Sequence, residues 1–140
     1  MNEVNKYFPL LLSAACFCLV GCDTLNYTQY VVTSATPTDR AVIKKAVEAS
    51  ATTAGLVDKT ETAIIPNVIV FYVEPVPHFP TTLGARMVND MAVVDLSCFH
   101  PGAAKPPAFQ SAESLLTTTL SREFGTRLTM PDRSHRVPMK

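Results

Sequence analysis

The sequence predicts an α+β two-layer sandwich, in which a mostly antiparallel sheet of four or five strands carries two helices on one face. Three observations support this fold class. Two segments repeat apolar residues at helical spacing, one short run is wholly β-branched or aromatic, and two alternating segments flank a turn. The chain is long enough for one ordinary domain with a hydrophobic core and needs no second one, so we expect one α+β domain over residues 27–130.

The first strand and the first helix are predicted near the start of this domain. Residues 27–34 contain Tyr, Val and Thr in a run that suits a pleated surface. Thr36 can cap a helix, Pro37 suits its first position and Asp39 can complete a capping box. Gly55 fits the left-handed position that ends a helix.

The middle of the chain predicts three further strands. Residues 68–73 have no polar interruption, which indicates an interior strand covered on both faces. Asn89 and Asp90 form a candidate two-residue turn between two more strands. This turn places three wholly apolar pairs on one face: Leu83 with Leu96, Ala85 with Val94, and Met87 with Ala92. Arg86 and Asp95 then lie close together on the other face.

A second helix, a short strand and a tail complete the predicted domain. Ser111 can cap the helix and Gly125 can end it. Its apolar stripe consists of Ala112, Leu115, Leu116, Leu120 and Phe124. Residues 126–130 predict the last strand, and residues 131–140 are expected to form a flexible basic tail.

The predicted order is strand, helix, strand, hairpin, helix, strand. This order resembles the split βαβ, ferredoxin-like arrangement with one additional hairpin strand. The resemblance implies two helices on one face of a largely antiparallel sheet. It implies no function, because many unrelated activities share this arrangement.

The N-terminus has the pattern of an export signal. A polar start is followed by an apolar run from Tyr7 to Val20, which is short for a bilayer-spanning helix and contains Pro9. The tetrapeptide Leu19-Val20-Gly21-Cys22 resembles the lipobox of bacterial lipoproteins. The resemblance covers residues 1–22 only, and an ordinary secretory signal followed by a chance cysteine is the alternative.

The lipobox resemblance implies a covalent lipid anchor. In that family the signal peptide, here residues 1–21, is cut between Gly21 and Cys22. Cys22 then carries a diacylglyceryl group on its thiol and an acyl chain on its amine, and residues 22–26 would form a lipidated tether. These lipids hold the protein on a membrane of the bacterial cell envelope. Asp23 favours the periplasmic face of the inner membrane, by the sorting rule of enteric bacteria. No other cofactor is expected.

Few residues of the mature chain suggest chemistry. Common catalytic and phosphate-binding motifs are absent from the sequence after residue 21. Cys98 and His100, with His78 on another proline-rich segment, could bind zinc or copper if their loops converge. The alternative is a buried thiol with two histidines on surface loops. A thiol enzyme would also need an orienting third group, and Asp95 is predicted on the opposite face.

The composition fits a protein-binding role better. The formal net charge is 0, without the clustered basic residues that nucleic-acid binding requires. Five apolar residues are candidates for contact with a partner, two beside prolines and three on the outer hairpin face: Phe79, Phe99, Val88, Met91 and Val93. Coverage by the tail or the proline-rich loops is the alternative for the hairpin face.

We therefore expect a lipid-anchored cell-envelope protein with a membrane and an envelope protein as partners. Its domain would act as a non-catalytic assembly or accessory subunit. The alternative is a small-molecule or metal-binding periplasmic domain that uses His78, Cys98 and His100.

Overall fold

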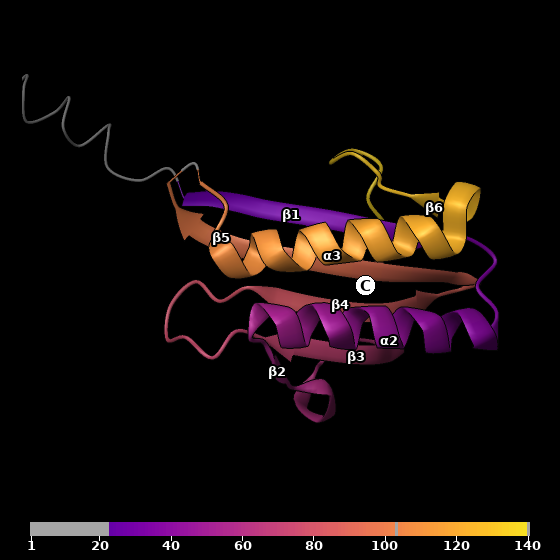
Figure 1. The fold of residues 1–140 in the computed structure, drawn as a ribbon, viewed down its shortest axis with the longest axis horizontal. Helices are drawn as coiled ribbons and strands as arrows, with labels where there is room; N and C mark the ends of the chain where they lie inside the picture. Colours follow the sequence, from indigo (N-terminus) through magenta and orange to yellow (C-terminus); the bar gives the residue numbers. More distant parts are fainter. Residues whose placement is uncertain (1–22, 103, 140) are drawn as a thin grey trace, which may run out of the picture.

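The computed structural model describes residues 23–102 and 104–139, which form a six-stranded sheet with two helices on one face (Figure 1). The signal peptide and Cys22 lie outside the described residues. Strand order is β2-β3-β4-β5-β1-β6, and all neighbouring strands are antiparallel. The elements are β1 Asp23–Val32, α2 Pro37–Ala54, β2 Val57–Asp58, η2 Thr60–Thr62, β3 Val68–Val73, β4 Thr82–Val88, β5 Met91–Pro101, α3 Pro107–Phe124, η3 Gly125–Arg127 and β6 Leu128–Thr129.

This architecture confirms the predicted α+β class and two-layer sandwich. The strand number is slightly higher than expected, because β2 and β6 add two residues each at the two edges of the sheet. Residues 56–66, between α2 and β3, contain β2 and η2. Within the described ranges, no helix is long and apolar enough to cross a membrane.

β1 starts four residues earlier than the sequence suggested. Residues 23–26, expected as a tether, pair with Cys98–Pro101 at the end of β5. Their polar composition resembles a linker, but β5 is eleven residues long and supplies partners for all of them. The strand therefore begins immediately after Cys22 in the sequence.

The predicted ends of α2 are confirmed. Thr36 accepts a hydrogen bond from the Asp39 N–H at 3.1 Å, and the Asp39 carboxylate accepts one from the Thr36 N–H at 2.9 Å. Gly55 adopts the left-handed conformation, with φ of 74°. The Leu56 N–H donates to the carbonyl oxygen of Ala51 and closes the last turn.

The hairpin of β4 and β5 has the register that the sequence predicted. Val88 faces Met91 across the turn, and Asn89 has a φ of 54°. The three apolar pairs point toward the helices. Arg86 and Asp95 share the opposite face, called here the outer face, and form an ion pair at 3.0 Å between Nε and Oδ2.

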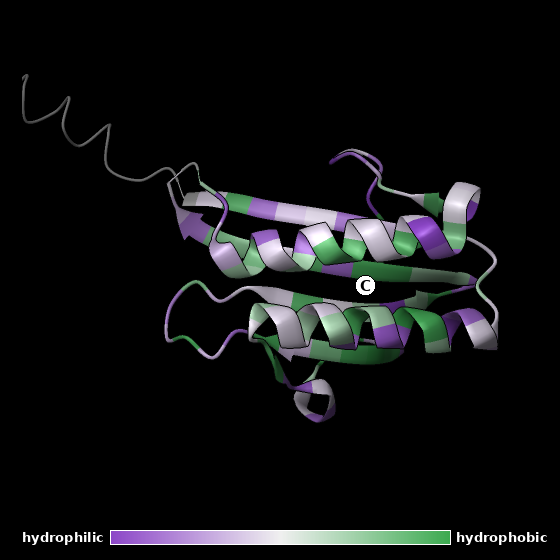
Figure 2. Ribbon diagram, in the orientation of Figure 1, coloured by the Kyte–Doolittle hydropathy of each residue, from purple (hydrophilic) through white to green (hydrophobic). Residues whose placement is uncertain are grey.

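β3 differs from the expected interior strand. Val70 and Tyr72 are buried, while the other four residues of the strand are only half-buried. β2 pairs with only the last two residues of β3, so most of β3 is an edge of the sheet. Figure 2 shows β3 as a largely hydrophobic strand, which explains why the sequence suggested deeper burial.

α3 starts before the predicted cap at Ser111. Pro107 occupies the first turn, and Phe109 is buried with no exposed surface. The added turn places an aromatic ring in the core, which stabilises the earlier start. Four residues of the predicted stripe are buried and Leu115 is half-buried. The predicted strand at 126–130 is shorter, because 125–127 form η3.

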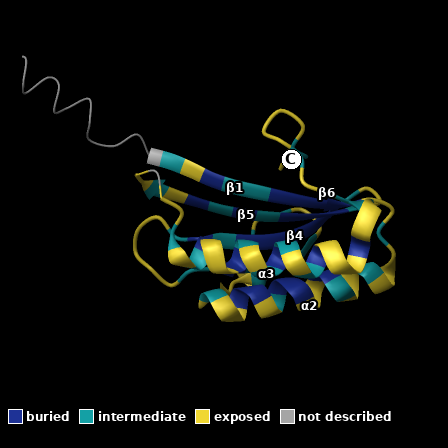
Figure 3. Cartoon of the chain, turned by 45° about the horizontal axis from the view of Figure 1, so that its top comes forward, coloured by how far each residue is buried: buried dark blue, intermediate teal, exposed yellow. Residues whose placement is uncertain are grey.

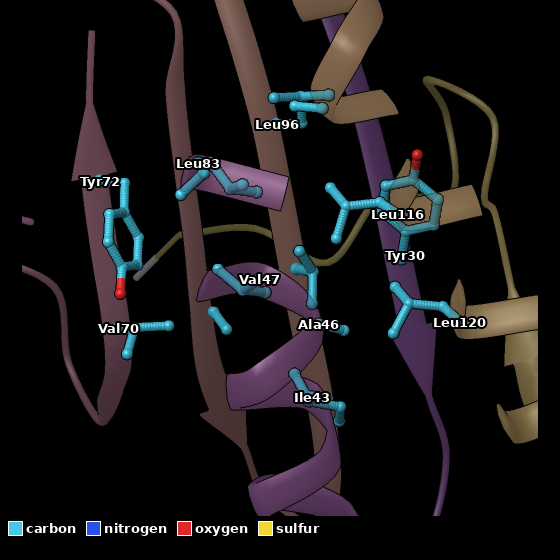
Figure 4. Packing of buried hydrophobic residues seen from close by; sticks show 14 of the residues in the cluster. Tyr30, Ile43, Ala46, Val47, Val70, Tyr72, Leu83, Leu96, Leu116 and Leu120 are labelled. Carbon is cyan, nitrogen blue, oxygen red and sulfur yellow. The ribbon is translucent and has the colours of Figure 1, made fainter. Parts of the chain in front are cut away.

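The core lies between the helices and the sheet. Side chains from α2, α3 and the central strands meet there, including Ile43, Val47, Tyr30 and Leu116 (Figure 4). Burial of these side chains removes apolar surface from water, at about 25 cal/mol per Å². The sheet's outer face has no comparable helical layer among the described residues, and this asymmetry bears on the functional site.

Candidate functional site

The end of the domain nearest the start of β1 gathers exposed apolar side chains. Leu25 pairs with Phe99 at this end, and the loop between β3 and β4 lies beside them (Figure 1). Leu25 is 43% exposed, Val76 41%, Phe79 45% and Phe99 54%. Figure 3 shows this loop as exposed along most of its length. We call these four residues the apolar tip.

Cys98 holds the loop of Phe79 in place. Its thiol donates to the carbonyl oxygen of Phe79, with 3.2 Å between sulfur and oxygen. Phe79 has a φ of 51°, a conformation that costs free energy in a bulky residue and persists where its surroundings impose it. The thiol contact and the neighbouring prolines therefore fix a Phe79 side chain that remains exposed.

Cys98 does not have the surroundings of a catalytic nucleophile. It is 2% exposed, and burial raises the pKa of its thiol, which lowers the thiolate fraction at neutral pH. Asp95 lies on the outer face, as predicted, where it pairs with Arg86. The structure therefore favours a structural role for this thiol.

Three buried polar atoms without hydrogen-bond partners lie near Cys98. They are Asn26 Nδ2, Thr81 Oγ1 and His100 Nδ1, and none has a partner within the described residues. Asn26 pairs with Cys98 across the strands, His100 follows two residues later, and Thr81 directly precedes β4. Unpaired buried polar atoms are uncommon and call for an explanation, which can be a bound polar molecule or an ion.

The predicted metal set does not come together as a group. Among the residues that the structure describes, no three His, Cys, Asp or Glu side chains are placed to hold one ion. His78 is exposed on the loop, and the neighbouring Phe79 carbonyl already accepts the Cys98 thiol. Cys98 and His100, two residues apart in β5, do share one face of the strand.

The outer face carries a buried polar network that the sequence predicted only in part. Arg86 is 4% exposed and pairs with Asp95, whose Oδ1 accepts a hydrogen bond from Gln29 Nε2 at 2.7 Å. The Tyr27 hydroxyl also donates to Asp95. Burial, and then this hydrogen bond, raise the pKa of Tyr27 well above its usual value. The network is thus built around one carboxylate.

The C-terminal segment completes this network. Arg86 donates to the carbonyl oxygens of Val137 and Pro138, at 3.0 and 3.2 Å. Gln29 exchanges two hydrogen bonds with Val137, and the Arg136 guanidinium stacks over the Tyr27 ring at 4.1 Å. Residues 136–138 therefore have defined contacts with the sheet. The flexibility expected for residues 131–140 stays a prediction.

Sequence reasoning could not find these tail contacts, because the acceptors are backbone carbonyls about fifty positions from Arg86. The cavity beneath the tail is small, with a volume of about 40 Å³. That volume holds roughly one or two waters. Tyr27, Phe71 and Met139 are among the residues that line it.

The remaining predicted contact residues lie at the opposite end of the sheet. Val88 and Met91 are half-buried beside the hairpin turn. A shallow depression of about 330 Å³ near this turn includes Val88 and Asn89. Val93 was predicted on the exposed outer face but is fully buried, since it lies between Val31 and Arg86 on neighbouring strands. It offers no contact surface in this structure.

Within the described residues, one side of β1 has no neighbouring strand from residue 23 to residue 30. β6 pairs only with Val31 and Val32. In an antiparallel ladder, alternate residues direct their backbone groups to opposite sides. The carbonyl oxygen of Tyr27 accepts a hydrogen bond from the Arg136 side chain, which lies outside the sheet. The odd-numbered residues of β1 therefore direct their backbone groups away from β5. The backbone groups of Leu25 therefore also point to this edge, whereas Gln29, in the same set, is 1% exposed and lies under the C-terminal segment.

Comparisons with known proteins found no match: no family model, no curated protein and no solved structure is significantly similar to this chain.

Proposed function

We propose that this chain is a lipid-anchored protein of the bacterial cell envelope whose domain binds another envelope protein. Its role would be that of a non-catalytic accessory or assembly subunit. The anchor is supported by the lipobox-like sequence that ends at Cys22. The absence of catalysis is supported by the burial of Cys98 and its raised pKa.

The open edge of β1 is the observation that carries the protein-binding proposal. A strand with unpaired backbone groups can accept an extended segment of another protein as an additional strand. Leu25 supplies such groups, while β6 covers the far end of β1 and the C-terminal segment covers Gln29. Backbone hydrogen bonds at this edge would give the affinity for the partner.

Crosslinking in whole cells tests this proposal with a matched pair of variants. Leu25→Pro removes a backbone N–H on the open edge, whereas Leu25→Ala removes only the side chain. Proline is tolerated at such positions on edge strands, so both variants should fold. We expect a defined partner with wild type and Leu25→Ala, and its loss with Leu25→Pro.

Cys22→Ser tests the anchor in the same experiment. Without lipid on residue 22, the chain would leave the membrane surface and lose a partner that is met there. A partner that survives both Leu25→Pro and Cys22→Ser would refute the edge and the anchor together. Mass spectrometry of the mature N-terminus shows independently whether the lipid is present.

A second candidate is a small-molecule or metal site at Cys98 and His100. The three unpaired buried polar atoms around Cys98 favour it. Metal analysis of the purified domain tests it, with Cys98→Ala as the key variant and His78→Ala as its control. The site would be supported if wild type and His78→Ala each contain one metal per chain and Cys98→Ala contains none. The metal would then be held by Cys98 and His100 without His78. Such a result would refute a role in protein interaction alone.

A further inference from the structure

We infer that the apolar tip rests in the headgroup region of the bilayer that holds the lipid anchor. This inference rests on the proposed lipidation of Cys22. It adds the orientation of the domain relative to the membrane. The occupant of the tip would be a lipid surface, and the opposite hairpin end would face away from the membrane. The argument uses the position of the anchor, the apolar side chains and the scarcity of charge around them.

The anchor and the tip are close in the chain. β1 starts at Asp23, so no spacer separates Cys22 from the folded domain. Three residues span at most about 11 Å, which limits the Cα distance between Cys22 and Leu25. Because Phe99 pairs with Leu25, it lies at the same level. Interfacial apolar groups enter a bilayer by about 5–10 Å, so an anchor at Cys22 brings these side chains within reach.

The tip has the exposed groups that an interface accepts. Four of the eight large hydrophobic residues that are exposed in the described ranges lie at this end. Two of them are aromatic, and aromatic rings favour the boundary between water and hydrocarbon. The Cys98 contact and the surrounding prolines hold Phe79 outward, so little conformational entropy is lost when it enters the interface.

Few charges oppose this contact. Residues 75–80 and 99–104 contain no Asp, Glu, Lys or Arg. The nearest charged side chains of the adjoining loops already have partners. Glu74 accepts the Thr81 N–H at 3.0 Å, and Lys105 forms an ion pair with Glu113 at 2.6 Å. The two loops of the tip, residues 75–80 and 99–104, therefore carry no Asp, Glu, Lys or Arg that contact with the bilayer would desolvate.

The opposite end provides an internal comparison. The hairpin turn at Asp90 is nine residue steps along β5 from Phe99 of the tip, a separation of about 31 Å. Asn89 and Asp90 are polar and exposed there. A domain that stands on its tip would keep this turn in water.

Tryptophan fluorescence tests the orientation directly, because the chain has no natural tryptophan. Phe79→Trp and Phe99→Trp place a probe at the tip, and Asp90→Trp places the control at the hairpin turn. Lipidated protein is reconstituted into phosphatidylcholine vesicles, with or without bromine on the acyl chains. We expect blue-shifted emission and quenching by brominated lipid for both tip variants, and neither change for Asp90→Trp.

Two outcomes would overturn the inference in distinguishable ways. If the protein carries lipid and floats with the vesicles but all three probes stay in water, tip contact is wrong and the anchor stands. If mature protein carries no lipid, the proposed anchor and the orientation both fail. The emission of Phe79→Trp could also shift to the blue only when a cellular protein is added, and never with vesicles alone. That result would refute a lipid surface as the occupant of the tip.

Discussion

The two faces of the sheet are buried by different means. The face toward α2 and α3 is closed by apolar side chains, with Phe109 and Leu116 fully buried. The outer face is closed by an ion pair, two polar side chains and a C-terminal segment that supplies backbone carbonyls. The stability of the first face depends on the volume and apolar area that its side chains bury. The stability of the second depends on each buried polar group having a hydrogen-bond or ion-pair partner.

This difference determines how each face responds to mutation. When a core side chain is truncated, the free energy of unfolding falls roughly with the volume of the cavity that remains. A buried polar network loses most when one partner is removed alone, because the other charge remains in a site without water. The predictions below separate these two responses.

The largest loss is expected on the helical face. Phe109→Ala removes a fully buried ring and should lower the free energy of unfolding by about 3–5 kcal/mol. Urea unfolding measures this change. Ser111→Ala alters an exposed residue of the same helix and should stay within about 0.5 kcal/mol of wild type. A Phe109→Ala loss as small as that of the control would mean that α3 contributes little to the core.

A loss of about 3 kcal/mol is expected when the ion pair is broken on the outer face. Asp95→Ala leaves the Arg86 guanidinium 4% exposed and without a carboxylate. The double variant Arg86→Met with Asp95→Leu removes both charges and should be more stable than Asp95→Ala alone. If the double variant is the less stable of the two in urea unfolding, the ion pair itself contributes net stability.

The sequence predicted the helical face better than the outer face. The hairpin register followed from three apolar pairs and the Asn89-Asp90 turn, which are local signals. The ends of α2 followed from Thr36, Asp39 and Gly55 for the same reason. A single sequence is therefore enough to predict which apolar residues are buried when these residues recur at regular spacing.

The outer face and the apolar tip depend on contacts between distant segments. Gln29 and Val137 meet only because the tail returns across the sheet. Residues 23–26 were expected to form a tether, because nothing local shows that β5 is long enough to pair with them. Cys98 was correctly predicted as a buried thiol, but its hydrogen bond to Phe79 depends on a loop nineteen residues away.

A smaller effect is expected from removal of the tail. Deletion of residues 136–140 removes the hydrogen-bond partners that the tail supplies to Arg86 and Gln29, and we expect the free energy of unfolding to fall by about 1–2 kcal/mol. The loss is limited because the uncovered groups regain water. Arg133→Ala, at an exposed tail position, should leave urea unfolding unchanged. An unchanged stability after the deletion would show that the tail covers the outer face without stabilising it.

The smallest expected effect is a change in how the free energy of unfolding depends on alkaline pH. It can be measured separately for a buried tyrosine on each face of the sheet. Burial raises the pKa of Tyr30 from 10.0 to about 12, with a further contribution from Glu113. The Tyr30 hydroxyl holds its proton more tightly in the folded chain than in the unfolded chain. The contribution of this proton to the free energy of unfolding is therefore complete below pH 10 and is lost as the pH rises toward 12.

Burial and the bond to Asp95 act in the same direction on Tyr27 at the outer face. Tyr30→Phe and Tyr27→Phe should each make the alkaline decline in unfolding free energy shallower, and Tyr30→Phe should cost about 1 kcal/mol of hydrogen bonding at neutral pH. Urea unfolding at neutral pH and above pH 10 measures both. An alkaline decline that Tyr27→Phe leaves unchanged would show that the outer face opens before its tyrosine ionises, and the tail would then be the weaker of the two coverings.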